Sequence, residues 1–166
     1  MNTERIELTI NGTKVALEVE RNWTLLYVLR EIMDLTGAKP GCNTGDCGAC
    51  KVLIDGEAKN SCLILARNAS GKNIQTIESI ADGPSLHPVQ QAFIDSGAIQ
   101  CGYCTPGMII SAKALLDKNL NPTEDEIREA LSNNLCRCTG YVKIVEAVKN
   151  AAAIMRGNDK HVGRRV

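Results

Sequence analysis

Three features are scarce in this chain of 166 residues, and each scarcity narrows what the protein can be. Aromatic residues are few, with one Phe, one Trp and three Tyr, so Leu, Ile, Val and Ala must fill any core. Net charge is absent because 19 basic residues balance 19 acidic ones, and nothing therefore favours nucleic acid or an acidic surface as a partner. No apolar run approaches the roughly 18 residues of a membrane span, and no signal peptide is readable. We therefore expect a cytoplasmic protein without a membrane span.

The chain also lacks the sequence signatures of substrate chemistry. It has no phosphate-binding glycine motif for a flavin or a nicotinamide nucleotide, and no readable nucleophile–base set. We therefore expect no catalytic residue in this chain. What it does have is eight cysteines. Structural disulfides are rare in the cytoplasm, so eight cysteines indicate metal binding.

The densest group of cysteines lies in residues 41–50, with the sequence GCNTGDCGAC. Its spacing, C-x4-C-x2-C, is that of plant-type iron–sulfur proteins, which use a fourth cysteine further along the chain. The four candidate ligands are Cys42, Cys47, Cys50 and Cys62. Asp55-Gly56 is a typical two-residue hairpin turn, and pairing about it places residue 62 opposite residue 49. The hairpin therefore predicts, independently of the motif, that Cys62 returns to the loop that holds the other three.

Hydrophobic patterns predict a small α+β domain around this loop, and we place that domain at residues 1–78. The expected elements are strands at 6–10 and 15–19 joined by an Asn11-Gly12 turn, a helix at 24–34, and strands at 52–54 and 74–77. Asn22 or Thr24 is the expected cap of the helix. Gly37 is expected to end it.

Helical signals replace the alternating pattern after a turn-rich linker at residues 82–85. Helices are predicted from Pro88 to Gly97, from a Thr105-Pro106 cap to about residue 118, from a Thr123-x-x-Glu126 capping box to about Asn133, and from about residue 141 onward. Four short helices favour a bundle as a second domain, at residues 79–157. Residues 158–166 are predicted to form a polar tail.

A second set of four cysteines lies in this helical half: Cys101, Cys104, Cys136 and Cys138. Each pair directly precedes a predicted helix, where free N–H groups and the helix dipole favour an anionic, thiolate-bound centre. Structural zinc is the main alternative, because it also uses paired cysteines. The second pair is spaced more tightly than zinc sites usually are, and the glycines of the first loop fit iron–sulfur better. From the spacing of the second set, zinc stays open; disulfides would need an oxidising compartment.

Three segments, GCNTGDCGAC, QCGYCTPGM and NLCRCTGY, resemble the small iron–sulfur subunit of the xanthine oxidase (molybdenum hydroxylase) family. All eight cysteines match in order and spacing, over nearly the whole chain. The resemblance implies an α+β fold, with an N-terminal ferredoxin-like β-grasp domain and a C-terminal all-α four-helix bundle. It also implies two [2Fe–2S] clusters, the first held by Cys42, Cys47, Cys50 and Cys62, and the second by Cys101, Cys104, Cys136 and Cys138.

The same resemblance implies partners and further roles. Gln100 and Cys138 would contact the pterin of a molybdenum cofactor in a large partner subunit. The first cluster would lie toward FAD in another subunit, and the complex would dimerise further. The chain would be an electron-transfer subunit, relaying single electrons between the molybdenum–pterin centre and a flavin or external acceptor.

The substrate of such a complex would be an N-heterocycle, an aldehyde, a purine or hydroxybenzoyl-CoA. The stretch from Cys138 to Ile144 favours the bacterial members that act on N-heterocycles or hydroxybenzoyl-CoA. Two alternatives come from other classes of protein. A freestanding ferredoxin would explain the first cysteine set but not the helical half, and a zinc-binding scaffold would explain eight cysteines without electron transfer.

Overall fold

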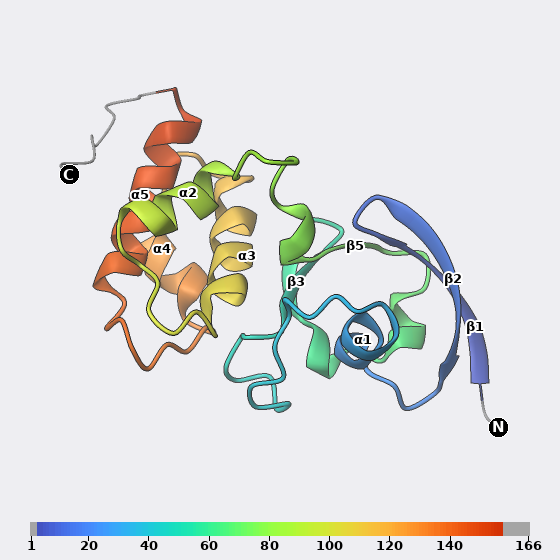
Figure 1. Cartoon of the computed structure of the whole chain (residues 1–166). Helices are drawn as coiled ribbons and strands as arrows, with labels where there is room; N and C mark the ends of the chain where they lie inside the picture. The colour runs from blue at the N-terminus through green and yellow to red at the C-terminus, as the bar shows by residue number, and fades with distance from the viewer. Residues whose placement is uncertain (1–2, 158–166) are drawn as a thin grey trace.

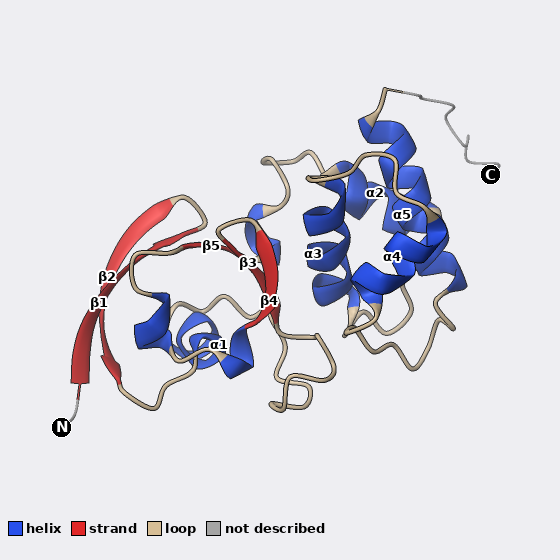
Figure 2. Cartoon of the chain, turned by 180° about the vertical axis from the view of Figure 1, so that it is seen from behind, coloured by secondary structure: helices blue, strands red, loops and turns tan. Residues whose placement is uncertain are grey.

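The computed structural model describes residues 3–157, with a sheet-containing first half and a helical second half (Figures 1 and 2). The strands are β1 (Thr3–Ile10), β2 (Thr13–Glu20), β3 (Lys51–Ile54), β4 (Glu57–Asn60) and β5 (Asn73–Gln75). They form a mixed five-stranded sheet in the order β2-β1-β5-β3-β4, which curves around the short helix α1 (Leu25–Tyr27). The second half consists of α2 (Pro88–Asp95), α3 (Thr105–Leu116), α4 (Glu124–Leu131) and α5 (Val142–Met155). The predicted α+β class, with strands first and four helices after, is confirmed.

Both predicted hairpins form in the predicted register. Asn11 and Gly12 have φ angles of 51° and 81°, and Asp55 and Gly56 have 51° and 84°. Positive φ at both central residues is what a two-residue hairpin turn requires. Ile10 therefore pairs with Thr13 in the first hairpin, and β3 pairs with β4 from Ile54↔Glu57 to Lys51↔Asn60. β5 joins the two hairpins, parallel to β1 and antiparallel to β3. It is shorter than predicted, because Ile77 already lies in a 3-10 turn (Ile77–Ser79).

β3 is shared by both halves, and all four of its residues are buried. Successive strand side chains point to opposite faces, so β3 contributes to two cores. Val52 and Ile54 pack in the core of the sheet, whereas Leu53 packs in the core of the helical half. Lys51 also faces the helices and donates a hydrogen bond to Ser111 of α3. The sequence pattern predicted the strand, but not that both of its faces are covered.

The helix predicted at 24–34 is shorter, and Gly37 does not end it. Thr24 is the cap, because its hydroxyl accepts the N–H of Tyr27 at 3.1 Å. The chain continues from α1 into a π-helical turn (Val28–Ile32), and Asp34 leaves it with a φ of 55°. Gly37 has a different function, since its N–H donates to Glu78 Oε1 at 2.7 Å and a Cβ there would lie 2.2 Å from Ile77. The glycine permits the close approach of a distant turn, which no local pattern reveals.

The four later helices match the predicted order. The Thr123–Glu126 capping box is confirmed: Thr123 Oγ1 accepts the N–H of Glu126, and Glu126 accepts the N–H of Thr123. The cap of α3 is Cys104 rather than Thr105, so that a cysteine of the second set itself begins the helix. α3 and α4 end about two residues earlier than predicted, which is the normal uncertainty of helix boundaries.

The helical half has its own core, in which α2 packs against α5 and α3 packs against α4 (Figure 2). Its largest fully buried side chains include Phe93, Met108, Ile110, Leu116, Ile127 and Ile144. The two cores divide close to the predicted boundary at residues 78 and 79, with Ile74 in the first and Ile80 in the second. The boundary itself stays a prediction, and the predicted tail at 158–166 lies outside the described residues. Among residues 3–157, none of the helices is both long and apolar enough to cross a membrane.

Candidate iron–sulfur centres

The first cysteine loop winds tightly between the π-helical turn and β3. Asn43, Gly45 and Gly48 all have positive φ angles, which turn backbone N–H groups toward the inside of the loop. Cys42 Sγ consequently accepts the N–H groups of Thr44 and Cys47, each at 3.4 Å. N–H donors of this kind stabilise an anionic sulfur, whether as a free thiolate or as a metal ligand.

Cys62 reaches this loop, though not as a member of the predicted ladder. β4 ends at Asn60, and Cys62 lies in the 3-10 turn that follows (Ser61–Leu63). Ser61 ties that turn to the loop, because its hydroxyl donates to the carbonyl oxygen of Cys50 at 2.7 Å. The thiols of Cys62 and Cys50 are then close enough to hydrogen-bond, and both cysteines are buried. The predicted approach of Cys62 is confirmed, and the predicted pairing of residue 62 with residue 49 is wrong.

The first-set thiols differ widely in acidity. The Thr44 hydroxyl, followed by the N–H groups of Cys47 and Thr44, lowers the pKa of Cys42 to about 6. Burial, followed by the neighbouring Cys50 thiol, raises the pKa of Cys62 to about 12. Burial also raises the pKa of Cys47. A thiol with a raised pKa ionises when a metal compensates its charge, because a coordinating thiol is deprotonated outright. The buried cysteines therefore suit a bound cation better than free reactivity in solution.

The second set is built from the loops before α3 and α5, as predicted. Cys101 Sγ and Cys138 Sγ lie 3.7 Å apart, and the Cys104 and Cys136 thiols are also neighbours. The separation of 3.7 Å matches the roughly 3.8 Å expected for two thiolates on one tetrahedral metal with bonds of about 2.3 Å. The four cysteines thus meet as two pairs, each with one member from each loop.

Acidity again differs within the second set. Burial, followed by the neighbouring Cys136 thiol, raises the pKa of Cys104 to about 12. Burial also acts to raise the pKa of Cys136, but hydrogen bonds from Thr139 and from the Cys138 backbone outweigh it and lower that pKa. The Thr139 hydroxyl donates to Cys136 Sγ at 3.1 Å. The hydrogen bond with Cys101 raises the pKa of Cys138.

Tyr141 holds the Cys136 loop in place, a function that its position in the sequence did not reveal. Its φ is 67°, an unusual value for a bulky residue, and it directly precedes α5. The phenol oxygen accepts the N–H of Cys136 at 2.8 Å and donates to the carbonyl oxygen of Asn134 at 3.3 Å. The strained backbone therefore positions a hydroxyl that fixes the peptide of a candidate ligand.

Gln100 and Cys138, the two residues expected to contact a pterin, are brought together. Gln100 Nε2 donates to the carbonyl oxygen of Cys138 at 3.0 Å. Cys101 and Cys138 are exposed, whereas Cys104 and Cys136 are partly covered. The second site therefore has one accessible end, and Gln100 lies at that end.

The two cysteine sites touch each other through the backbone. The N–H of Leu135, next to Cys136, donates to the carbonyl oxygen of Cys47 at 2.9 Å. Asn134 Nδ2 donates to the carbonyl oxygen of Gly48 at 3.2 Å. We call this contact the interdomain seam, and define it by Cys47, Gly48, Lys51, Gly107, Ser111, Asn134 and Leu135.

The donor sets fit two [2Fe–2S] clusters. Such a cluster takes four cysteines, two on each iron, and both sites offer their thiols as pairs. Among residues 3–157, no three His, Cys, Asp or Glu side chains converge as they would around a single metal ion. Pairs of thiols, with N–H and O–H donors directed at sulfur, are the arrangement that a two-iron centre needs.

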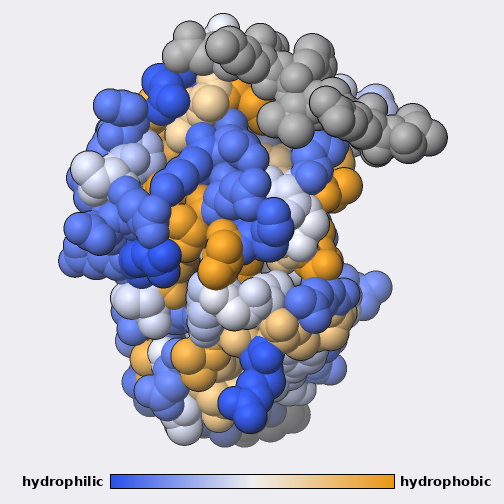
Figure 3. All heavy atoms as spheres, turned by 90° about the vertical axis from the view of Figure 1, so that its left-hand side faces the viewer, coloured by the Kyte–Doolittle hydropathy of each residue, from blue (hydrophilic) through white to orange (hydrophobic). Residues whose placement is uncertain are grey.

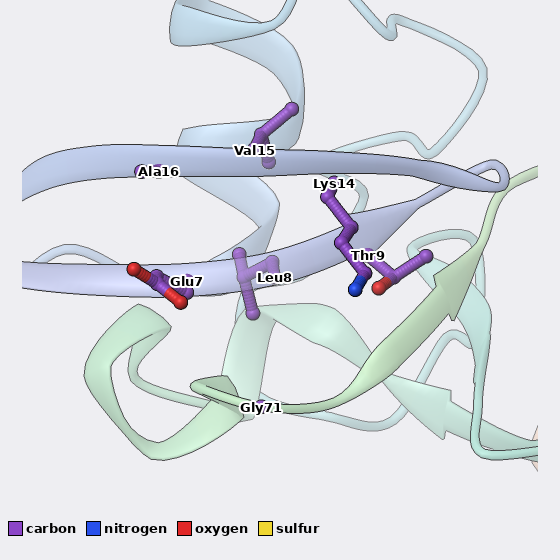
Figure 4. A pocket seen from close by; sticks show the side chains of 7 residues that line it. All are labelled: Glu7, Leu8, Thr9, Lys14, Val15, Ala16 and Gly71. Carbon is purple, nitrogen blue, oxygen red and sulfur yellow. The ribbon is translucent and has the colours of Figure 1, made fainter.

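Surface hollows add little to this assignment. A hollow of about 400 Å³ lies against β1 and β2, between Lys14 and Gly71, and contains none of the cysteines (Figure 4). A second hollow, of about 320 Å³, is lined by Tyr27, Asn43 and Cys62, and so opens beside the first site.

Comparison with known proteins identifies the family. A model described as "2Fe-2S iron-sulfur cluster binding domain" matches residues 8–81, and one described as "[2Fe-2S] binding domain" matches residues 76–149. The nicotinate dehydrogenase small FeS subunit of Eubacterium barkeri is 50% identical over 151 residues, covering 91% of this chain and 96% of the relative. The xanthine dehydrogenase iron-sulfur-binding subunit of Escherichia coli O157:H7 is 50% identical over 148 residues, covering 88% and 92%.

The chain belongs to the family of small iron–sulfur subunits of molybdenum hydroxylases. The fold agrees, because the crystal structure of quinoline 2-oxidoreductase from Pseudomonas putida 86 superposes with a TM-score of 0.89 at 44% identity, over 96% of this chain and 100% of that chain. As a small iron–sulfur subunit, the chain contains two [2Fe–2S]-binding domains, one for each cysteine set, and the first is ferredoxin-like. The resemblance drawn from the cysteine motifs is confirmed, whereas the assignment of individual ligands stays a prediction.

Proposed function

We propose that this chain relays single electrons through two [2Fe–2S] clusters, between a molybdenum–pterin centre in a large partner subunit and a flavin or external acceptor. When bound, a [2Fe–2S] cluster supplies one-electron transfer. The observation that carries the proposal is the contact between the two sites, in which Leu135, next to Cys136, donates its N–H to the Cys47 carbonyl oxygen. Because the two cysteine sites meet at one seam, electrons could pass directly from one cluster to the other. Two unrelated metal sites would not need to lie so close together.

The ligands that we propose are the eight cysteines in their two sets. The first site would be held by Cys42, Cys47, Cys50 and Cys62, and the second by Cys101, Cys104, Cys136 and Cys138. Around them the chain supplies hydrogen bonds from Thr44, Cys47 and Thr139 to sulfur. Donors to sulfur and the degree of burial both tune a cluster's potential, so the two sites are expected to differ in potential.

The exposed end of the second site is the proposed contact with the large molybdenum–pterin subunit. Gln100 and Cys138 lie there, joined by their hydrogen bond, and we propose that both contact the pterin. Nearby chain segments carry exposed apolar side chains, with Leu135 56% and Val142 67% exposed. In the view of the helical side, hydrophobic residues reach the surface between hydrophilic ones (Figure 3). Exposed apolar residues surrounded by polar ones are typical of a subunit interface.

The first site is the proposed end toward FAD, carried by a further subunit. Leu63, directly after Cys62, is 61% exposed, and the hollow beside Cys62 is lined by Tyr27 and Asn43. These features offer an apolar contact next to a candidate ligand. We further propose that the complex dimerises, and that it works in the cytoplasm, where eight reduced cysteines remain available to bind iron.

The proposed substrate is an N-heterocycle. All three related proteins above have names that refer to an N-heterocycle: nicotinate, quinoline and the purine xanthine. The stretch from Cys138 to Ile144 favours the same choice or a hydroxybenzoyl-CoA. Substrate contacts would lie in the large subunit, so the decisive observation is turnover of the purified complex with nicotinate, an aldehyde, xanthine and hydroxybenzoyl-CoA in parallel, with an artificial electron acceptor.

Composition and spectroscopy test the electron relay. The full-length chain, purified anaerobically, should contain about four irons with equal acid-labile sulfide, and should show two distinguishable EPR signals after reduction by dithionite. It should also co-purify with a large molybdenum-containing subunit. Stoichiometric zinc without visible absorption would instead establish a structural scaffold. Iron–sulfur clusters without any large partner would establish a freestanding ferredoxin.

A further inference from the structure

Lys51 is a buried cation in the interdomain seam. It is 8% exposed although it is the charged residue of β3, whose other three residues are apolar. Its ammonium donates to Ser111 Oγ at 2.9 Å and to Asn134 Oδ1 at 2.7 Å. The Ser111 hydroxyl donates in turn to Asn134 Oδ1 at 2.7 Å, which closes a triangle. A lysine ammonium has donors alone, and both of these oxygens accept from it.

Both acceptors of Lys51 are neutral, and this leaves its charge uncompensated. None of the ion pairs among residues 3–157 includes Lys51. A buried charge is costly unless it is paired, and neutral hydrogen bonds satisfy its donors without cancelling its field. Burial lowers the pKa of Lys51, and the Cys50 side chain, which precedes it in the chain, acts in the opposite direction. The contacts of Lys51 lead to the first cysteine loop, because Asn134, which accepts from its ammonium, donates to the carbonyl oxygen of Gly48 at 3.2 Å. An anion bound at the first cysteine site would therefore compensate this charge.

We propose that the Lys51 ammonium is the counter-charge of the first [2Fe–2S] cluster and raises its reduction potential. This inference rests on the proposed function, because it requires a cluster held by the first cysteine set. One-electron reduction adds a negative charge to a centre that four thiolates already make anionic. A buried cation stabilises the reduced form more than the oxidised form, and the seam excludes the water that would screen it. Lys51 would thus act on the first cluster through its charge, without touching a substrate.

The direction in which the reduction potential of the first cluster shifts when Lys51 is replaced distinguishes this role from a purely structural one. If Lys51 merely holds the seam together, its loss admits water to the first site. Water stabilises the more charged, reduced form and would shift the potential upward. If Lys51 supplies the compensating charge, its loss shifts the potential downward. The two roles therefore predict opposite shifts of the same measured quantity.

An EPR-monitored redox titration of the full-length, cluster-containing chain measures that shift. Lys51→Met removes the charge and keeps the length of the side chain, whereas Lys51→Gln removes the charge and keeps a hydrogen-bond donor. Lys51→Arg keeps the charge. Lys59→Met is the matched control, because Lys59 lies on the adjacent strand β4, is exposed and is paired with Glu57. The signal that disappears in Cys47→Ser identifies the first cluster.

At the wild-type midpoint potential, we expect the ratio of reduced to oxidised first cluster to fall by about tenfold in Lys51→Met and Lys51→Gln. For a one-electron couple this is a shift of about 59 mV to lower potential. Lys51→Arg and Lys59→Met should stay near the wild type, and the second cluster should shift less than the first. An unchanged or raised potential in both neutral variants would overturn the role of Lys51 while leaving the relay intact. A wild-type chain without the first cluster signal would overturn both proposals.

Discussion

Gln100 and Cys138 illustrate how one hydrogen bond can assemble a contact surface from distant residues. They are 38 positions apart in the chain, and the Gln100 amide joins the backbone of a candidate ligand at the exposed end of the second site. Nothing in the local sequence distinguishes Gln100 from an ordinary loop amide. Its position next to two exposed thiols is the basis for the proposed role of Gln100 as a contact for the molybdenum cofactor.

Gln100→Ala should leave both clusters in place and weaken the contact with the molybdenum cofactor. We expect unchanged EPR signals, and about fivefold weaker cofactor retention or turnover in the assembled complex, because one hydrogen bond is worth about 1 kcal/mol and each 1.4 kcal/mol is a factor of about ten. Gln91→Ala is the control, since Gln91 is a partly exposed amide on α2 that donates to Asp95. Unchanged cofactor content and turnover would count against the proposed role of Gln100.

The first residue of α2 is capped by a titratable side chain, so the strength of this cap should depend on pH. His87 is the N-cap, and its Nδ1 accepts the N–H of Val89 at 3.2 Å. Only a neutral imidazole can accept this bond. Burial, followed by the positive charge of Lys113, lowers the pKa of His87, against the opposing influence of Asp117.

The stability of the helical half should therefore fall on acidification. The folded-state pKa of His87 lies below its ordinary value of about 6.5, so the unfolded chain binds more protons between the two values. The cap contributes fully above about pH 6.5 and is lost as the pH falls through the folded-state pKa, at a cost of up to about 1 kcal/mol. Thermal midpoints measured by circular dichroism at several pH values check this. His87→Asn, which caps without titrating, should have a flatter profile, and an equal slope in both proteins would refute the assignment.

The glycine of α3 is a packing residue rather than a flexible one. A Cβ at Gly107 would lie 2.2 Å from the carbonyl oxygen of Gly48, and a Cβ at Gly48 would lie 2.1 Å from the carbonyl oxygen of Asn133. Both obstacles are backbone atoms, which cannot rotate away. The two glycines therefore allow the first cysteine loop and α3 to approach across the seam.

Gly107→Ala should destabilise the chain although alanine is the better helix former. Overpacking costs about 1–3 kcal/mol, whereas helix propensity favours alanine by about 1 kcal/mol. We therefore expect a lower thermal midpoint, with broadened or shifted EPR signals from both clusters because both loops meet at this contact. A higher midpoint with unchanged signals would show that the seam can relax.

The two halves have separate cores but share β3, whose residues pack on both sides. This arrangement fixes the position of one cysteine site relative to the other, while each half keeps its own core. Each site is built from loops of its own half, and the seam joins them through backbone groups, as in the bond from Leu135 to Cys47. Loss of a thiol on one side should therefore leave the other site formed.

Cys47→Ser should abolish the first EPR signal and leave the second largely unchanged. The substitution removes one ligand of the first site, but keeps the carbonyl group that accepts the N–H of Leu135. The iron content should fall to about half that of the wild type. Cys101→Ser is the matched variant and should show the opposite loss. If a folded Cys47→Ser chain lost both signals, the two sites would not be independent.

Local patterns were sufficient wherever the interacting residues are neighbours in the chain. The Asn11-Gly12 and Asp55-Gly56 turns set their hairpins, and Thr123 and Glu126 cap α4, because each of these arrangements involves residues within about three positions. The spacing of the first cysteines likewise predicted iron–sulfur binding, since metal coordination demands a strict order of ligands, and the resemblance of the cysteine segments indicated the family. The strand run through Val52 and Ile54 predicted burial, although not on two faces.

Long-range packing decided the rest. Lys51 meets Ser111 and Asn134 across separations of 60 and 83 residues, and Gly37 meets Glu78 across 41. A charged residue at the start of a strand is usually explained by solvent exposure, and a glycine after a helix by the helix end. Neither explanation accounts for Lys51 or Gly37, whose partners are distant in the chain. The amino-acid pattern determined which residues could bind metal and which segments could form strands or helices. The folded chain determined where the buried lysine charge lies, because a charge acquires its surroundings only when distant segments close over it and exclude water.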